Sequence, residues 1–286
     1  MTTQAYDLTL PLRRMTSVVF ASPHSGRHYP PEFLERSILD ERTIRTSEDA
    51  FVDQLLDCVP GFGAPLIAAR APRSYIDLNR ASDELDPALV DGVRPAGHNP
   101  RISSGLGVIP RVVSGGRAIH RGKIPLAEAE ARIATWWTPY HARLQALLDE
   151  TRAEFGEAVL ADFHSMPHEA IESLASNGAR RPDIVIGDRF GATAHPAVVE
   201  RIEEAFERAG LRVMRNAPFA GAFIAQTYGR PSRRQHAVQI EMDRSLYMNE
   251  QEIRPNGNFL GFKRLLRQVL AEIAGIGRSS LPVAAE

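Results

Sequence analysis

The chain has 286 residues, of which 43% are hydrophobic and 24% charged, a composition ordinary for a globular protein. Its 34 basic and 35 acidic residues nearly balance, so the overall charge offers no general attraction to nucleic acid or to an anionic membrane surface. The single cysteine, Cys58, excludes an internal disulfide and a thiolate zinc cluster, and it fits a reducing compartment.

The first part of the chain contains short apolar runs of strand length. Residues 16–21 read TSVVFA and predict a buried strand, so His24 lies just past a strand end. After a glycine-rich turn, APLIAA at 64–69 predicts another strand, and SYIDLNR at 74–80 predicts a further extended segment.

A helix is predicted between these strands. Apolar residues from 51 to 59 follow helical spacing, and acidic residues stand just before them, where a first turn favours negative charge. We therefore expect Asp49 to open this helix, directly after Glu48.

The middle of the chain combines a long loop with a long helix. Residues 81–118 are rich in Gly, Pro, Ser and Arg, which predicts a surface excursion of the kind that often covers an active site. Residues 126–155 show a strong helical pattern, which Pro139 should kink or divide. At this spacing we assign Trp136 and Trp137 to the core rather than to a ligand platform.

Strands and helices continue to alternate in the second half. We predict strands at 158–163, 183–187, 211–214 and 237–242, and helices at 196–209 and 258–276. This alternation favours one α/β domain over residues 1–286, with its core at about 15–270 and catalytic groups at strand ends. With no secretion signal and no apolar run near the ~18 residues of a membrane span, we expect a cytoplasmic protein.

Three segments place a possible metal ligand beside an apolar run. His24 and His164 follow predicted strands, and Asp49 or Glu48 stands at the predicted helix start. Two histidines and one carboxylate are a common catalytic zinc set with an open fourth position. The alternative, two ordinary polar histidines, remains open on spacing alone, and the absence of HExxH excludes a thermolysin-type site.

Two acidic residues lie within or beside apolar strands. Asp162 should project to the same face as His164, either orienting that ligand or capping a neighbouring loop. Glu241 lies inside AVQIEM, where a carboxylate must be paired, bound to metal or raised in pKa, and a general base would explain it. Its alternative is a salt bridge to a nearby arginine, Arg233, Arg234 or Arg244.

Five blocks together resemble the N-formylglutamate amidohydrolase family. They occur in the family's order and are SPHSGRHYP at 22–30, SEDAFVDQL at 47–55, RSYIDLNR at 73–80, DFHSMP at 162–167 and the segment 216–248. The likeness spans about residues 15–270, and the joint occurrence of five blocks is far more specific than any single one.

The resemblance implies a fold and a metal. The family is related to zinc carboxypeptidases and aspartoacylases, so a phosphorylase/hydrolase-like fold is expected, with a mixed sheet flanked by helices. One Zn²⁺ per chain would be held by two histidines and an acid. In those relatives the acid follows the first histidine by three residues, where this chain has Arg27. We therefore expect His24, Asp49 and His164 as ligands, with Glu48 as the fallback acid.

The same resemblance implies roles for other residues. Arg73 would stabilise the oxyanion, and Asn79 with Arg80 would hold the substrate α-carboxylate. Glu241 would take a proton from the attacking water and pass it to the leaving nitrogen. The substrate side chain would need its own cation, for which Arg230 beside a glycine turn is the candidate, although such arginines are equally often surface charges.

Together these residues predict zinc-dependent hydrolysis of N-formyl-L-glutamate to formate and L-glutamate, with histidine degradation implied by the resemblance. The expected partner is a small N-acylated acidic amino acid, and the chain would be a monomer or small homo-oligomer. Alternatives are a deacylase or small carboxypeptidase acting on another amide, or a non-catalytic binding protein on the same fold. A serine hydrolase using Ser25 or Ser165 is disfavoured because neither lies in a nucleophile-elbow sequence.

Overall fold

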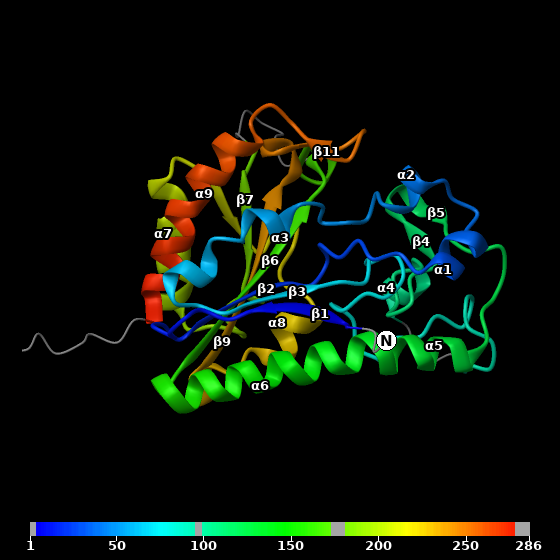
Figure 1. Cartoon of the computed structure of the whole chain (residues 1–286), viewed down its shortest axis with the longest axis horizontal. Helices are drawn as coiled ribbons and strands as arrows, with labels where there is room; N and C mark the ends of the chain where they lie inside the picture. Colours follow the sequence, from blue (N-terminus) through cyan, green and yellow to red (C-terminus); the bar gives the residue numbers. More distant parts are fainter. Residues whose placement is uncertain (1–3, 95–98, 173–180, 278–286) are drawn as a thin grey trace, which may run out of the picture.

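A seven-stranded mixed β-sheet lies at the centre of the computed structural model, which describes residues 4–94, 99–172 and 181–277 (Figure 1). The strand order is β1-β3-β2-β6-β9-β7-β8. The strands are β1 (Tyr6–Thr9), β2 (Val18–Ser22), β3 (Leu66–Ala69), β6 (Ala158–Met166), β7 (Ile184–Gly187), β8 (Val213–Arg215) and β9 (Gln235–Asp243). β3, β2, β6 and β9 run parallel, whereas β1 and β7 are antiparallel to their neighbours β3 and β9. The predicted mixed sheet between helices is confirmed.

Helices cover both faces of this sheet. The helices on these faces are α3 (Val52–Leu55), α6 (Thr138–Phe155), α7 (Pro196–Arg208), α8 (Phe223–Tyr228) and α9 (Phe259–Ala274). Four others lie to one side of the sheet in Figure 1: α1 (Pro31–Arg36), α2 (Glu41–Ile44), α4 (Pro100–Ser103) and α5 (Leu126–Arg132). Two small hairpin pairs complete the described elements: β4 (Val112–Val113) with β5 (Arg117–Ala118), and β10 (Met248–Asn249) with β11 (Arg254–Pro255). Within the described ranges, no helix combines the length and apolar character that crossing a bilayer needs.

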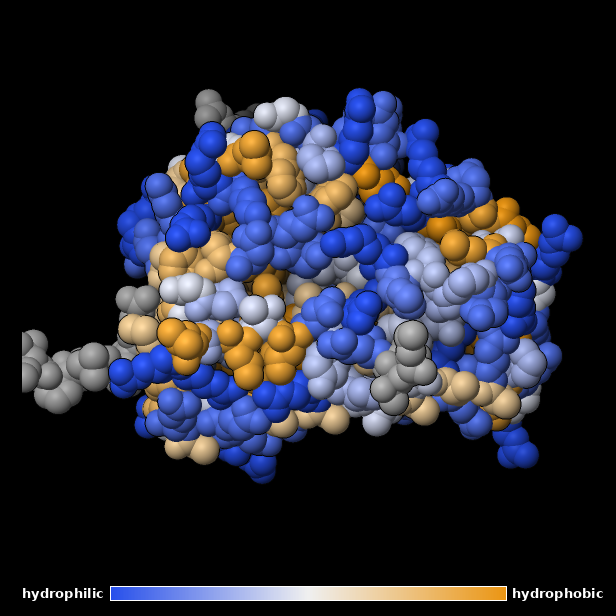
Figure 2. Space-filling model, in the orientation of Figure 1, coloured by the Kyte–Doolittle hydropathy of each residue, from blue (hydrophilic) through white to orange (hydrophobic). Residues whose placement is uncertain are grey.

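The alternation of side chains along each strand divides the core into two layers. Val18, Phe20 and the matching residues of β6, β7 and β9 pack against α3, α7 and α9. Residues of the opposite parity, such as Val19 and Leu160, pack against α6 and α8. Figure 1 shows α7 and α9 together on one side and α6 on the other. Hydrophilic residues cover much of the outer surface in Figure 2.

The face of the sheet towards α6 and α8 changes from apolar to polar along the strands. On β6, Ala158 and Leu160 are followed by Asp162 and His164, and on β9 Ala237 is followed by Gln239 and Glu241. All of them are buried. The carboxyl ends of the parallel strands therefore carry polar groups where the apolar packing ends.

Two of the expected elements differ in the structure. The helix after Asp49 is only four residues long, because Phe51 adopts a left-handed φ of 69° and the helix starts at Val52. Asp49 therefore precedes the helix by three residues instead of opening it. Residues 74–80 form turns in place of a strand, since Asp77 accepts a hydrogen bond from the backbone N–H of Asn79 at 2.8 Å.

The long helix is divided near the expected proline. α5 and α6 are joined through a π-helical segment, Ile133–Trp137, and Pro139 lies in the first turn of α6, where its missing N–H costs least. Trp136 is buried in the core, as predicted. Trp137 also packs into the core, and its indole N–H donates to the Arg80 carbonyl at 2.9 Å, which ties this helix to the turns at 74–80.

Candidate metal centre and active site

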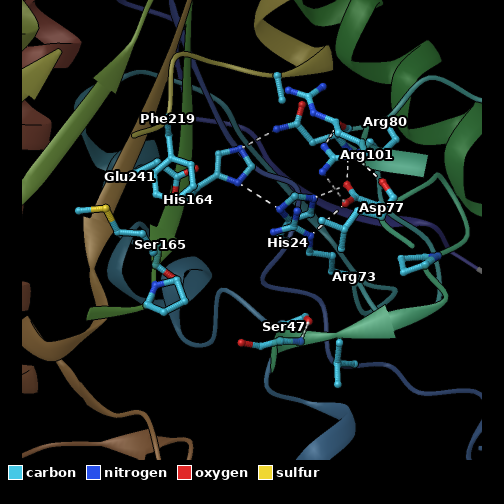
Figure 3. A pocket seen from close by; sticks show the side chains of 18 of the residues that line it. His24, Ser47, Arg73, Asp77, Arg80, Arg101, His164, Ser165, Phe219 and Glu241 are labelled. Atoms are coloured by element: carbon cyan, nitrogen blue, oxygen red, sulfur yellow. Dashed lines mark hydrogen bonds and ion pairs between the residues drawn. The ribbon is translucent and has the colours of Figure 1, made fainter. Parts of the chain in front are cut away.

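His24, Asp49 and His164 come together at the carboxyl ends of β2 and β6. One ligand atom from each lies within 4.8 Å of the others, and all three side chains are buried. The two Nδ1 atoms are 3.1 Å apart, and Asp49 Oδ2 lies 3.1 Å from His164 Nδ1 and 3.5 Å from His24 Nδ1. Figure 3 shows the two imidazoles side by side, with a dashed line between them.

The local fold accounts for this convergence. β2 and β6 are parallel neighbours, so His24, two residues after β2, and His164, near the end of β6, lie at the same sheet edge. Asp49 is held against them because its backbone N–H donates to the His24 carbonyl at 3.0 Å. The neighbouring Glu48 is buried, but it accepts hydrogen bonds from Tyr29 and Arg45 and does not join the cluster.

Carboxylates fix the orientation of both imidazoles. His24 Nε2 lies 2.7 Å from Asp77 Oδ1, and His164 Nε2 lies 3.0 Å from Asp162 Oδ2. Each Nε2 therefore carries the hydrogen in the neutral ring, and each Nδ1 offers a lone pair towards Asp49. Two lone pairs and a carboxylate oxygen that converge in this way are the donor set of a metal site.

The charges around the cluster favour a cation. Burial lowers the pKa of His164, but the Asp162 and Asp49 carboxylates outweigh it and raise this pKa well above its usual range. Burial raises the pKa of Asp49, yet its contacts with both histidines hold it well below the usual value. Arg244 donates to the second oxygen of Asp49 at 3.0 Å and so fixes that carboxylate from behind.

Glu241 faces the same cavity from β9. Its Cα is paired in register with that of His164, which places the two side chains side by side on one face of the sheet. Gln239 Nε2 donates to Glu241 Oε1 at 2.8 Å. Among the described residues Glu241 has no ion pair with Arg233, Arg234 or Arg244, so the salt-bridge alternative does not hold. Burial is the main cause that raises the pKa of Glu241.

The cavity beside these groups has a volume of about 500 Å³. Its walls include His24, His164, Glu241, residues 218–222 and part of the 81–118 excursion. The residues of that excursion that line it are Arg101, Ser104, Leu106, Pro110 and Val112 to Gly116. The predicted long surface segment does cover the site.

Arg73, Asn79 and Arg80 all line this cavity. Arg73 Nε donates to Asp77 at 3.0 Å, and the charges of Asp77, Asp49 and Glu241 raise the pKa of Arg73 although burial opposes them. Arg80 donates to the carbonyls of Leu106 and Asn79. Burial lowers the pKa of Arg80.

Asn79 is engaged by the protein itself. Its Nδ2 donates to Gln239 Oε1 at 3.2 Å, and its Oδ1 accepts from the backbone N–H of Ile224 at 2.8 Å. Asn79 therefore connects the turns at 74–80 to β9 and to α8. This arrangement favours a positioning role over the direct carboxylate contact that we expected.

Arg230 lies away from the cavity, contrary to the expectation that it meets the substrate. It is exposed and donates to the carbonyls of Gln226 and Gly229 near the start of β9, whereas Glu241 lies near the end of that strand. The turn at Gly229, which suggested a binding loop, lies at the amino end of β9, whereas the cavity lies at the carboxyl ends of the parallel strands.

Four polar residues of the site received no role from the sequence: Asp77, Gln239, Arg244 and Arg101. Asp77 carried a usable signal, because an acid between apolar residues and flanked by two arginines must be paired. Gln239 stands two residues before Glu241 and so shares its face. Arg244 and Arg101 showed nothing that distinguishes them from the chain's many other arginines.

A buried histidine supports the site from α6. His141 Nε2 lies 2.9 Å from the Leu78 carbonyl and its Nδ1 lies 2.8 Å from the Tyr228 hydroxyl, so the ring joins the turns at 74–80 to α8. The carbonyl contact requires the hydrogen on Nε2, which leaves Nδ1 as the acceptor. Burial lowers the pKa of His141 to about 4.

This histidine predicts acid sensitivity of the fold. The unfolded chain takes up the proton near pH 6.5 and the folded chain only near pH 4, so stability falls as the pH decreases through this window, by up to about 3 kcal/mol. Denaturant unfolding at pH 7 and pH 4.5 should show a smaller acid-induced loss in His141→Gln than in the wild type. Equal losses in both proteins would contradict this assignment.

The chain is similar to several known proteins over most of its length. The model of the family described as N-formylglutamate amidohydrolase matches residues 16–248. The N-formylglutamate deformylases of Pseudomonas aeruginosa and Pseudomonas putida are 32% and 31% identical over 84% and 82% of this chain, and 85% and 83% of their own lengths. The crystal structure of N-formylglutamate amidohydrolase from Ralstonia eutropha JMP134 is 35% identical, with a TM-score of 0.88 over 95% of this chain and 97% of that one.

Proposed function

The chain belongs to the N-formylglutamate amidohydrolase family, and from this premise we propose that it hydrolyses N-formyl-L-glutamate to formate and L-glutamate with one zinc ion. The observation that carries the proposal is the convergence of His24, Asp49 and His164 beside a buried glutamate in a cavity rich in arginine.

Zinc is the metal that suits these ligands best. Two imidazoles and one carboxylate form a three-ligand catalytic zinc set, and Asp77 and Asp162 would orient the imidazoles as outer partners do in such sites. When bound, the metal would supply a Lewis acid for the amide carbonyl and lower the pKa of water.

Glu241 performs the proton transfers in this proposal. Its carboxylate accepts a proton from the attacking water, whose oxygen bonds to the formyl carbon. The protonated Glu241 then donates this proton to the amide nitrogen while the carbon–nitrogen bond breaks, releasing formate and the amine of glutamate. Burial raises the pKa of Glu241, which suits a carboxylate that both accepts and returns a proton.

Two arginines bind the substrate on either side of the reacting carbon. Asp77 holds Arg73 close to the charges of Asp49 and Glu241. We assign Arg73 the role of stabilising the negative charge that develops on the carbonyl oxygen. Arg80 is buried, two carbonyls fix its Nε and Nη1, and its Nη2 lies 3.9 Å from Asp77 Oδ2. Because this distance is beyond hydrogen-bond range, we assign Nη2 to the α-carboxylate of the substrate.

Gln239 positions the base, and its loss should be measurable. Its amide donates to Glu241 and accepts from Asn79 and from the backbone N–H of Ala222 at 3.0 Å. In Gln239→Leu the Glu241 carboxylate loses the hydrogen bond that Gln239 donates, so we expect kcat to fall about 10- to 100-fold with KM within about threefold. Gln239→Glu keeps the size of the side chain but removes the N–H that donates to Glu241, so it should not restore kcat. A selective rise in KM would contradict a positioning role.

The direct test of the function is formate release from N-formyl-L-glutamate, with metal content measured on the same sample. Turnover that a chelator abolishes would support the proposal. Zinc binding without turnover would indicate that the substrate is another N-acyl amino acid. A panel of N-formyl and N-acetyl amino acids would identify it. Absence of both metal and turnover would refute the proposal.

A further inference from the structure

The cavity carries more positive than negative charge. Four arginines line it, Arg73, Arg80, Arg101 and Arg244, against two carboxylates, Asp77 and Glu241. Three of the arginines are engaged by the protein: Arg73 with Asp77, Arg80 with two backbone carbonyls and Asp77, and Arg244 with Asp49 and Ser165. Arg101 differs from them, because its guanidinium has no hydrogen bond or ion pair within the described part of the chain.

Arg101 stands on a well-anchored segment. It lies in α4, where Asn99 accepts from its backbone N–H at 3.0 Å, and its carbonyl accepts from Leu106 N–H at 2.8 Å. Leu106 is held in turn by Arg80, and Ser103 by Arg111. The position of this arginine over the cavity is therefore set by several hydrogen bonds, although its side chain is exposed.

Arg101 and Arg80 approach the cavity from the same wall. Figure 3 shows both labelled together beyond Asp77. The Arg101 charge is close enough to contribute to the lowered pKa of Arg80, after burial and Arg73. Two like charges held near each other are the arrangement that an anion with two separated carboxylates would neutralise.

We propose that Arg101 binds the side-chain carboxylate of the substrate and so selects acidic N-acyl amino acids. This inference rests on the proposed function and deepens it. N-formylglutamate carries an α-carboxylate and a side-chain carboxylate, and Arg80 accounts for the first. Arg101 supplies the cation for the second, the role for which Arg230 lies too far away.

The test compares a charged substrate with its neutral isostere. Arg101→Met should lower kcat/KM for N-formyl-L-glutamate about 10- to 100-fold, mainly through KM, as expected for loss of a charge-assisted hydrogen bond. For N-formyl-L-glutamine, which lacks the charge, the change should stay within about threefold. Arg101→Lys should restore part of the discrimination. Arg121→Met is the matched control, since Arg121 is exposed and near the same excursion but does not line the cavity.

Binding measurements separate this inference from the proposed reaction. Calorimetric titration of the zinc-loaded Glu241→Gln protein with each compound reports affinity without turnover, with and without Arg101→Met. A loss of affinity for the glutamate compound alone supports the inference, even if the wild type releases no formate. Equal losses for both compounds, or no loss for either, would overturn it.

Discussion

The Glu241→Gln variant is expected to lose about 10²- to 10⁴-fold in kcat for N-formyl-L-glutamate, the usual range for removal of a general acid–base group. Glutamine cannot accept the proton of the attacking water or return it to the leaving nitrogen. Its carbonyl oxygen can still accept the hydrogen bond from Gln239, so the side chain should keep its place. KM and zinc content should therefore remain close to those of the wild type.

The measurement is a steady-state assay of formate release with zinc quantified on the same preparations. Glu169→Gln provides a control, because Glu169 is an exposed acid just after β6 that does not line the cavity. Near-normal turnover in Glu241→Gln would remove this residue from the chemistry. Loss of zinc together with activity would instead make it a metal ligand.

Asp49→Ala is expected to lower kcat by more than about 10³-fold. It should also weaken zinc binding by at least about 100-fold, because even the loss of a residue that only orients a ligand can weaken metal binding by up to about 100-fold. Among the residues that the structure describes, Asp49 is the one carboxylate that lies near both Nδ1 atoms. Its removal would also leave the buried Arg244 without its acid, which adds a cost in stability.

Glu48→Ala is the matched control, because Glu48 is the adjacent buried acid and faces Tyr29 and Arg45 instead of the histidines. It should keep zinc and most of the activity. Competition with a chromophoric chelator gives the zinc affinity, and thermal unfolding shows whether each variant is folded. If Glu48→Ala loses zinc while Asp49→Ala retains it, the assignment of the acidic ligand is wrong.

The parts of the site that the sequence predicts are those attached to strands. His164 and Glu241 lie in apolar runs whose period of two fixes the face of each side chain, and His24 follows another such run. Parallel strands end at the same edge of a sheet. The three apolar segments, each predicted separately as a strand, therefore indicate one common site.

The remaining parts depend on backbone conformations and contacts that have no periodic signal. Asp49 reaches the histidines because Phe51 interrupts the helical pattern with a left-handed φ. A left-handed φ at an apolar residue cannot be predicted from the sequence. Asp77 acts from a turn that was expected to be a strand. Arg230 precedes β9 and so lies at the end of this strand away from Glu241, whereas Arg101 reaches the cavity through the contacts of α4, which leave no pattern in the sequence.

The register between β6 and β9 has a consequence for how the enzyme can be altered. His164 and Glu241 are Cα partners, so the distance between a ligand and the base is set by the strand spacing of roughly 4.8 Å and by no loop. Arg101 and the other outer walls of the cavity belong to an excursion that can change without shifting that pairing. Laboratory evolution confined to residues 99–118 is therefore a route to amidases for other acylated amino acids that keep the same hydrolytic step.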